Sequence, residues 1–162
     1  MRHVISVLVD NKHSVLSRIS GLFSARGYSI ESLSAAPVDV DGLARMTIVV
    51  KGDDWVVEQI NKQLNKLIDV AKVVDMTGEN FIDRELVLVK VNSTKSTRPE
   101  IMQVANIFRA KIVDISPRTL TVEATGSEAK INAIIGMLRP FGIKELARTG
   151  QIAMSREFTG KL

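Results

Sequence analysis

The stretch LVDNKHSVLSRISGLFSARGYSIESL, residues 8–33, decides how this chain folds. It begins as the end of an alternating apolar strand over residues 4–10 and turns through Asn11. Apolar residues then recur on one helical face, at Leu16, Ile19 and Phe23. Gly27 provides a C-terminal stop, and residues 28–38 read as a second strand. The stretch therefore predicts strand, helix, strand.

The first half of the chain continues with a hairpin and a second helix. DVDG at residues 39–42 predicts a turn between the second strand and a third at residues 44–52. Asp53 can cap the next helix, and residues 70–76 form a fourth strand. The predicted buried stripe of this helix is Val56, Ile60, Leu64 and Leu67.

The second half repeats this series. The predicted elements are a strand at 85–92, a helix with a T-x-x-E capping box at Thr97 and Glu100, a hairpin pair over 110–126, a helix capped by Ser127 and ended by Pro140, and a strand at 142–150. Leu16, Ile19 and Phe23 map onto Ile101, Val104 and Phe108. The repeat predicts an α+β fold of two ferredoxin-like, split βαβ domains in tandem, residues 1–78 and 82–162.

The first strand is apolar on both faces. Ile5, Val7 and Val9 point one way, and Val4 and Leu8 point the other. Helices cover only one face of a split βαβ sheet, so we expect the second face to lie against the other domain or another subunit. The alternative is a central strand with a mildly apolar exposed face.

Composition excludes several classes of function. The chain is 45% hydrophobic and 25% charged, which is typical of a globular protein. It has no cysteine, which removes disulfides and thiolate chemistry and fits a reducing compartment. No apolar run approaches the roughly 20 residues of a membrane helix, and the N-terminus lacks a signal-peptide pattern. We expect a cytoplasmic protein without a membrane partner.

Charge is unevenly distributed along the chain. Residues 1–80 carry nine Lys and Arg against ten Asp and Glu, whereas residues 81–162 carry thirteen against eight. A basic half can bind nucleic acid, but both signs are interspersed and the strands at 4–10 and 44–52 lack the aromatic residues on which RNA bases stack. A solvated face or a docking surface for an acidic protein is the favoured interpretation.

No residue pattern predicts catalysis. His3 and His13 lie at no metal-binding spacing, and the motifs of nucleotide-binding loops and of serine nucleophiles are absent from the sequence. The remaining candidate is the turn before the first helix, because a helix N-terminus favours a carboxylate and Val15 and Leu16 could receive a hydrocarbon side chain. The alternative is that Ser14 merely caps the helix. The residues alone leave both possibilities open.

Several stretches resemble the small, regulatory subunits of acetolactate synthase (acetohydroxyacid synthase), which begin with an ACT domain. They are residues 11–33, LARMTIVV, QINKQLNKLIDVAKVVD, RELVLVKV, IVDISPRTLTVEATG and GIKELARTGQIAMSR, and together they span nearly the whole chain. The resemblance implies that residues 1–78 are an ACT domain that binds an effector and dimerises, and that the chain has no active site or cofactor of its own.

The resemblance also implies a partner and a role. The partner is a catalytic large subunit that carries thiamine diphosphate, Mg²⁺ and FAD and condenses pyruvate with a second 2-oxo acid, on the route to valine, leucine and isoleucine. The small subunit raises this activity and confers feedback inhibition, typically by valine. Rival readings are an amino-acid sensor without an enzyme partner and a nucleic-acid-binding module.

In that family the effector lies between the turn and helix start of one protomer and the second strand of the other. The matching positions are Asn11, Val15, Leu16, Ile30 and Glu31. The chain departs at Ser14, where the family has Gly, and at Ser29, where it often has Asn. A Ser14 hydroxyl that capped the helix would compete with the effector carboxylate, at about 1 kcal/mol, whereas one that bonded the ligand would preserve affinity. Competition predicts tighter valine binding in Ser14→Gly.

Overall fold

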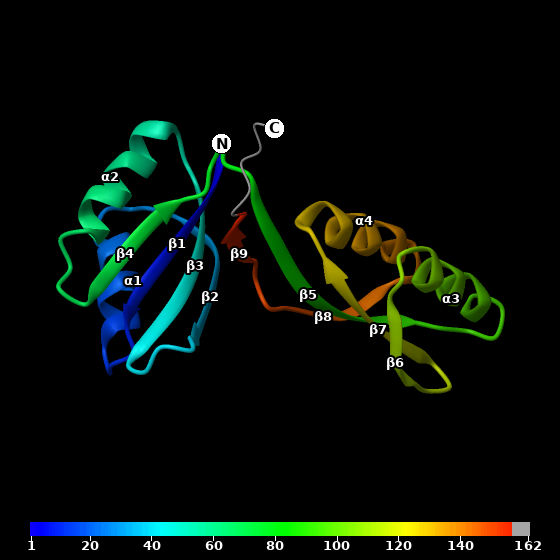
Figure 1. Ribbon diagram of the computed structural model, residues 1–162. Coiled ribbons are helices and arrows are strands. Elements are labelled where there is room, and N and C mark those ends of the chain that lie inside the picture. The colour runs from blue at the N-terminus through cyan, green and yellow to red at the C-terminus, as the bar shows by residue number, and fades with distance from the viewer. Residues whose placement is uncertain (157–162) are drawn as a thin grey trace, which may run out of the picture. The chain divides into compact units, whose positions relative to one another are not determined.

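The computed structural model describes residues 1–156, which fold as two βαββαβ units (Figure 1). The elements of the first unit are β1 (Arg2–Asp10), α1 (Val15–Ala25), β2 (Ile30–Pro37), β3 (Leu43–Lys51), α2 (Asp54–Leu64) and β4 (Val70–Asp75). Those that follow are β5 (Phe81–Asn92), α3 (Arg98–Ile107), β6 (Lys111–Ile115), β7 (Thr119–Gly126), α4 (Glu128–Leu138), the 3-10 helix η1 (Arg139–Phe141), β8 (Ile143–Arg148) and β9 (Ile152–Ser155). The predicted α+β class and the tandem split βαβ architecture are confirmed.

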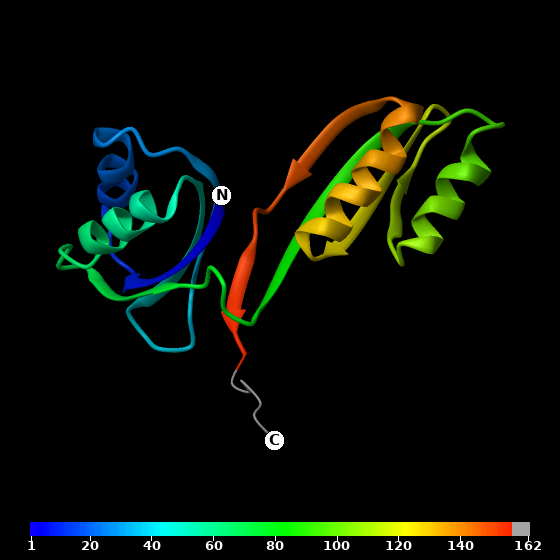
Figure 2. The same cartoon turned by 90° about the horizontal axis from the view of Figure 1, so that it is seen from above.

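Each unit is an antiparallel sheet with both of its helices on one face (Figure 2). The strand order is β2-β3-β1-β4 in the first sheet and β6-β7-β5-β8 in the second, in which β9 also pairs with β5. The alternation of β1 places Ile5, Val7 and Val9 under the helices, where they meet Ile19 of α1 and Ile60 of α2. Alternating strands and helical stripes therefore form one core per unit, as the apolar periodicity predicts.

Two details of the predicted helix stripes are wrong. Val57, not Val56, is buried in α2, and Val56 is only half-buried beside the core. Leu16 is 49% exposed, whereas its predicted counterpart Ile101 is fully buried. The apolar spacing is compatible with two rotations of each helix about its axis. Packing against the sheet selects the rotation that was not predicted.

The correct alignment of the units follows from their first helices. Gly27 after α1 and Arg109 after α3 both have positive φ, at 67° and 52°. The next residues, Tyr28 and Ala110, each donate a backbone N–H to the carbonyl five positions back, at 3.0 and 2.8 Å. Arg109 is therefore the counterpart of Gly27. Counting back along both helices pairs Ile19 with Ile101 and Leu16 with Arg98.

The helix starts match the predictions in two cases out of three. Asp53 accepts a hydrogen bond from the backbone N–H of Val56 at 2.9 Å, and Ser127 caps α4 in the same way. The capping box at Thr97 and Glu100 is wrong, because the Thr97 side chain makes no cap bond in α3. Thr97 instead exchanges hydrogen bonds with Thr94, whose backbone N–H donates to Thr97 Oγ1 at 2.9 Å and whose Oγ1 accepts from the Thr97 N–H at 3.2 Å.

The end of the described chain covers part of the second face of the first sheet, around Val4. Val4 and Val49 form a small buried cluster with Met76 and with Ala153 of β9. The compact units accordingly are Met1–Ile82 with residues 151–156, called unit 1 below, and Asp83–Gly150, called unit 2. The predicted division, 1–78 and 82–162, differs in the segment 151–156, which packs with unit 1 because its apolar residue Ala153 fills that cluster.

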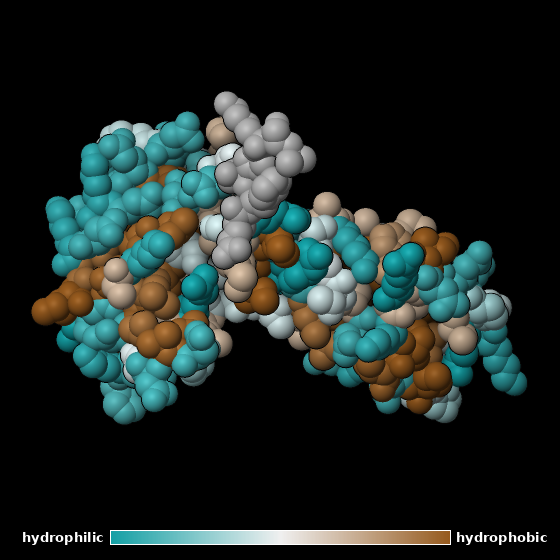
Figure 3. All heavy atoms as spheres, in the orientation of Figure 1, coloured by the Kyte–Doolittle hydropathy of each residue, from teal (hydrophilic) through white to brown (hydrophobic). Residues whose placement is uncertain are grey.

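Apolar side chains remain exposed on both units, and Figure 3 shows them over the first sheet as well as over unit 2. Ile107, Val113 and Ile115 are each at least half exposed, and Figure 3 shows apolar side chains gathered over the hairpin that contains β6 in unit 2. No helix within residues 1–156 is both long enough and apolar enough to cross a membrane.

Candidate functional site

A pocket of about 200 Å³ opens at the turn between β1 and α1 of unit 1. Its lining residues are Val9, Asp10, Asn11, Lys12, Val15, Leu16, Ala35, Ala36, Pro37, Ala44 and Met46. The turn is fixed by the backbone N–H of Asn11, which donates to the Gly42 carbonyl at 2.8 Å. This bond ties the turn to the β2–β3 hairpin, so the pocket lies between the helix start and the end of β2.

The helix start at this pocket has no side-chain cap. Ser14 adopts a left-handed conformation with φ 72°, and its hydroxyl makes no cap hydrogen bond. The interpretation of Ser14 as a capping residue is therefore wrong. The first N–H groups of a helix have no partner within the helix, so at α1 they remain available to a carboxylate beside Val15 and Leu16.

The pocket combines charges of both signs with an aliphatic wall. The Lys12 ammonium lies 2.6 Å from the Asp10 carboxylate, and the hydrogen bond to that carboxylate raises the pKa of Lys12. Asp10 can accept a hydrogen bond from an ammonium group, while Lys12 and the helix start attract a carboxylate. Val15 and Leu16 supply apolar contacts. This combination suits a small zwitterion with a hydrocarbon side chain.

The predicted site residues divide into two groups. Asn11, Val15 and Leu16 line the pocket, and Ser14 adjoins them as the N-cap of α1. The others lie elsewhere in the same protomer: Ser29 precedes β2, and Ile30 and Glu31 begin it. Ile30 pairs with Val50 and Pro37 with Ala44, so the start of β2 is at the opposite end of the strand from the pocket.

Sequence reasoning missed the contribution of the end of β2. Ala35, Ala36 and Pro37 line the pocket, and opposite them stands Ala44 of β3. The signal in the sequence was the run of short side chains in SAAP, because small residues on a strand next to a hairpin leave room for a ligand.

Glu31 already has partners within its own protomer. Its carboxylate accepts a hydrogen bond from Arg2 Nε at 2.8 Å and lies 3.2 Å from Lys51 Nζ. The hydrogen bond from Arg2 lowers the pKa of Glu31, against an opposing effect of partial burial and with a further contribution from Lys51. These three residues join β1, β2 and β3 at one end of the sheet.

His3 does not behave as a surface histidine. It is 1% exposed, with Nε2 3.2 Å from the Gly52 carbonyl and Nδ1 3.0 Å from Thr77 Oγ1. A carbonyl can only accept, so Nε2 donates to Gly52, and Nδ1 shares a hydrogen bond with the Thr77 hydroxyl. His3 is a satisfied core residue and has no free nitrogen for catalysis.

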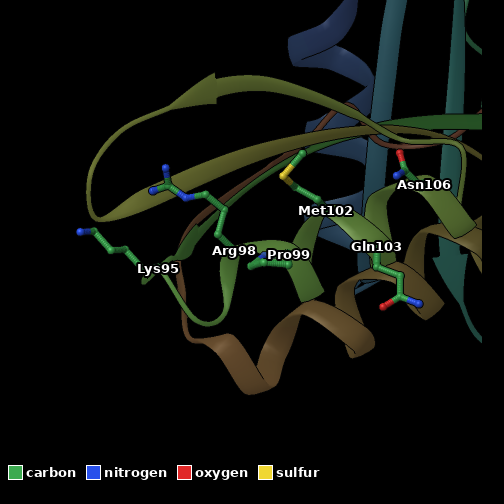
Figure 4. A pocket seen from close by; sticks show the side chains of 6 residues that line it. All are labelled: Lys95, Arg98, Pro99, Met102, Gln103 and Asn106. Carbon is green, nitrogen blue, oxygen red and sulfur yellow. The ribbon is translucent and has the colours of Figure 1, made fainter.

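Unit 2 has two further depressions. The first lies along α3 and is lined by Lys95, Arg98, Pro99, Met102, Gln103 and Asn106 (Figure 4). The second lies on the open face of the sheet, where Lys90 and Glu145 form an ion pair at 2.8 Å. This contact raises the pKa of Lys90 and lowers that of Glu145. The described part of the chain contains no group of three or more His, Cys, Asp or Glu side chains placed to hold a metal ion.

Two family models match the chain. Residues 5–72 match the model of the AHAS small subunit-like ACT domain, which defines the class of unit 1 as an ACT domain. Residues 84–157 match the model of the small subunit of acetolactate synthase. The chain therefore belongs to the family of acetolactate synthase small subunits, which are regulatory rather than catalytic subunits of that complex.

Individual relatives are similar over nearly their whole length. A probable acetolactate synthase small subunit of Methanothermobacter thermautotrophicus is 56% identical, over 95% of this chain and 92% of the relative. The acetolactate synthase small subunit of Aquifex aeolicus is 51% identical, over 99% and 84%. The crystal structure of the small subunit from Thermotoga maritima is 40% identical and superposes with a TM-score of 0.87, over 96% of this chain and 98% of that one.

Proposed function

We propose that this chain activates the thiamine diphosphate-dependent catalytic subunit of acetolactate synthase and makes it sensitive to valine. In this proposal unit 1, which contains the ACT domain predicted at residues 1–78, binds the effector and dimerises, and unit 2 forms the second domain. Thiamine diphosphate, Mg²⁺ and FAD belong to the catalytic partner. The observation that carries the proposal is the pocket at the uncapped start of α1, which joins a carboxylate-binding helix end to an aliphatic wall.

The size and chemistry of the pocket support a branched-chain amino acid as its ligand. A volume of about 200 Å³ holds a small molecule but is below the usual range of cofactor-sized sites. The α-carboxylate would meet the first N–H groups of α1, and the ammonium group would meet Asp10. The hydrocarbon side chain would then contact Val15, Leu16 and Ala35.

A homodimer would bring the remaining predicted residues to this pocket. β2 is an edge strand, so its outer backbone groups are free to pair with a second copy. If two β2 strands pair antiparallel about their midpoints, the start of one strand lies beside the end of the other. Ile30 and Glu31 of the partner subunit would then stand next to Pro37, at the mouth of the pocket.

Regulation requires that valine bind one arrangement of this dimer more tightly than another. The coupling between effector and catalytic subunit is then reciprocal, so valine weakens the activating arrangement only as far as its affinities for the two arrangements differ. A site built from both protomers provides such a difference, because a change in the β2 pairing alters the pocket directly.

The test is reconstitution with the catalytic subunit. Addition of the chain should raise acetolactate formation, and valine should lower it again. Ala35→Leu, which fills the pocket, should weaken valine inhibition at least tenfold and leave activation intact. Ala25→Leu is the matched control, because Ala25 is exposed at the far end of α1 and is not among the residues that line the pocket. Lack of activation at any ratio of subunits would contradict the proposal.

A further inference from the structure

The turn after the first strand of unit 2 makes the same hydrogen bond to its hairpin as the turn at the pocket of unit 1. The backbone N–H of Ser93 donates to the Arg118 carbonyl at 2.8 Å, as that of Asn11 donates to Gly42 at 2.8 Å. Both bonds tie the turn after the first strand of the unit to the hairpin between its second and third strands. Ser93 is therefore the counterpart of Asn11.

The hairpins themselves correspond as well. The backbone N–H of Ser116 donates to the Thr119 carbonyl at 2.9 Å, and that of Val38 donates to Leu43 at 3.2 Å. Ser116 thus follows β6 as Val38 follows β2. In the alignment of the helices, Arg98 corresponds to Leu16 of unit 1. The helix and hairpin correspondences together place Arg98 at the wall of the space in unit 2 that corresponds to the unit 1 pocket.

Arg98 spans this equivalent space. Its Nε donates to Ser93 Oγ at 3.1 Å, and its Nη2 donates to the Ser116 carbonyl at 2.7 Å and more weakly to that of Pro117 at 3.4 Å. Figure 4 shows the side chain extending from the start of α3 toward the turn that joins β6 and β7. The guanidinium therefore connects the turn to the strand end, which is where a ligand would lie in unit 1.

The burial of the turn changes accordingly. Asn11 is exposed at the mouth of the unit 1 pocket, whereas its counterpart Ser93 is 3% exposed. All three acceptors of Arg98 are neutral oxygens, and within residues 1–156 no carboxylate lies within ion-pair distance of it. A buried hydroxyl and two carbonyls that converge on one guanidinium make a site for a forked cationic donor.

We propose that this turn of unit 2 is a guanidinium-binding site that the chain fills with its own Arg98, so that a free amino acid binds only in unit 1. The restriction of amino-acid binding to unit 1 rests on the proposed function, since it takes the unit 1 pocket to be the effector site. The guanidinium-binding site in unit 2 does not depend on it. Arg98→Ala should vacate the site and create a protein that binds guanidinium ion from solution.

The experiment is thermal unfolding of the full-length chain without any effector. Arg98→Ala should melt about 5 °C below the wild type, because it leaves the buried Ser93 hydroxyl and the Ser116 carbonyl without their guanidinium partner. Low millimolar guanidinium chloride should restore part of that loss, whereas sodium chloride at the same ionic strength should not. Arg139→Ala is the control, since the exposed Arg139 side chain makes no hydrogen bond in the described structure. Equal melting of Arg98→Ala and wild type, or an equal guanidinium effect on both variants, would overturn the inference.

A second variant covers the case in which Arg98→Ala does not fold. Arg98→Lys keeps the charge but cannot reach Ser93 and the turn carbonyls together, so it should melt below the wild type. Wild-type melting of this variant would count against the site. Calorimetric titration of the wild type with valine should give one site per chain. Two sites per chain would overturn the inference and leave the proposed function intact.

Discussion

A left-handed backbone at Ser14 places strain at the entrance of the pocket beside α1. Ser14 and Arg109 are the two non-glycine residues with positive φ in the described part of the chain, at 72° and 52°. A Cβ atom makes this conformation cost roughly 1 kcal/mol or more, and glycine removes the penalty. Ser14 makes no cap bond that would compensate. No capping hydrogen bond of the Ser14 side chain therefore offsets this strain.

Ser14→Gly should raise the free energy of unfolding by about 0.5–1 kcal/mol, because it relieves this strain. Valine affinity should stay within about twofold, since the hydroxyl does not occupy the helix N–H groups that the carboxylate needs. Urea unfolding and calorimetry measure the two quantities. Ser17→Gly, in the right-handed part of α1, is the control and should lower stability by about 0.5 kcal/mol.

Glu31 gives unit 1 an acid-sensitive contact. Its pKa is lowered in the folded state by Arg2, so the carboxylate contributes stability above the unfolded pKa, and that contribution is lost as the pH falls through the folded pKa. The wild type should therefore lose more stability than Glu31→Gln when the pH falls from 7 to about 3. Unfolding curves at several pH values test this.

The control for Glu31 is Glu79→Gln. Glu79 is exposed, and its carboxylate forms no ion pair among the residues that the structure describes. Its replacement should leave the pH dependence of the wild type unchanged. Identical pH profiles for Glu31→Gln and the wild type would contradict the coupling of Glu31 to Arg2.

At the scale of elements, the start of α3 depends on two threonines rather than on a Thr–Glu box. Thr94 and Thr97 satisfy each other's backbone N–H groups through their side-chain oxygens. Thr94→Ala should therefore destabilise unit 2 by about 1 kcal/mol, the usual cost of a lost cap. Lys95→Ala, one residue further on and exposed, should change stability by less than about 0.5 kcal/mol. Chemical unfolding followed by circular dichroism distinguishes the two variants.

Periodicity predicted the order of helices and strands because each unit has one buried face. The alternation of apolar residues was sufficient to predict β1, and Asp53 was sufficient to predict the start of α2. The sequence did not predict which face of α1 is buried. Val15 and Leu16 are both apolar, and only packing decides that Val15 is the buried one. β9 was also missed, since four residues after Gly150 are too few for a pattern.

The candidate site was predictable only in part for the same kind of reason. Asn11, Val15 and Leu16 adjoin in sequence, so a turn and a helix start bring them together. Ala35 and Pro37 reach the pocket through the pairing of β2 with β3, which is a long-range contact that local patterns do not encode. The correspondence between Arg98 and Leu16 likewise becomes visible only when the folded units are aligned.

At the scale of the whole molecule, the last described strand belongs to the first unit. Ala153 is 6% exposed in the cluster with Val4, Val49 and Met76. Ala153→Glu should therefore destabilise unit 1 by about 3 kcal/mol, because it buries an unpaired charge. Met154→Glu is the control, since Met154 is 61% exposed and should tolerate the change. Fluorescence of Trp55, the single tryptophan of the chain, reports on unit 1 during urea unfolding.

The position of β9 also sets an order on biosynthesis. A ribosome makes Val4 almost first and Ala153 almost last, yet the two side chains share one buried cluster. The nascent unit 1 must wait with Val4, Val49 and Met76 uncovered until unit 2 has been translated. An apolar face that stays open during translation is a natural contact for chaperones or for a second nascent chain. A stop codon before residue 151 should consequently damage the first domain to be made, not the last.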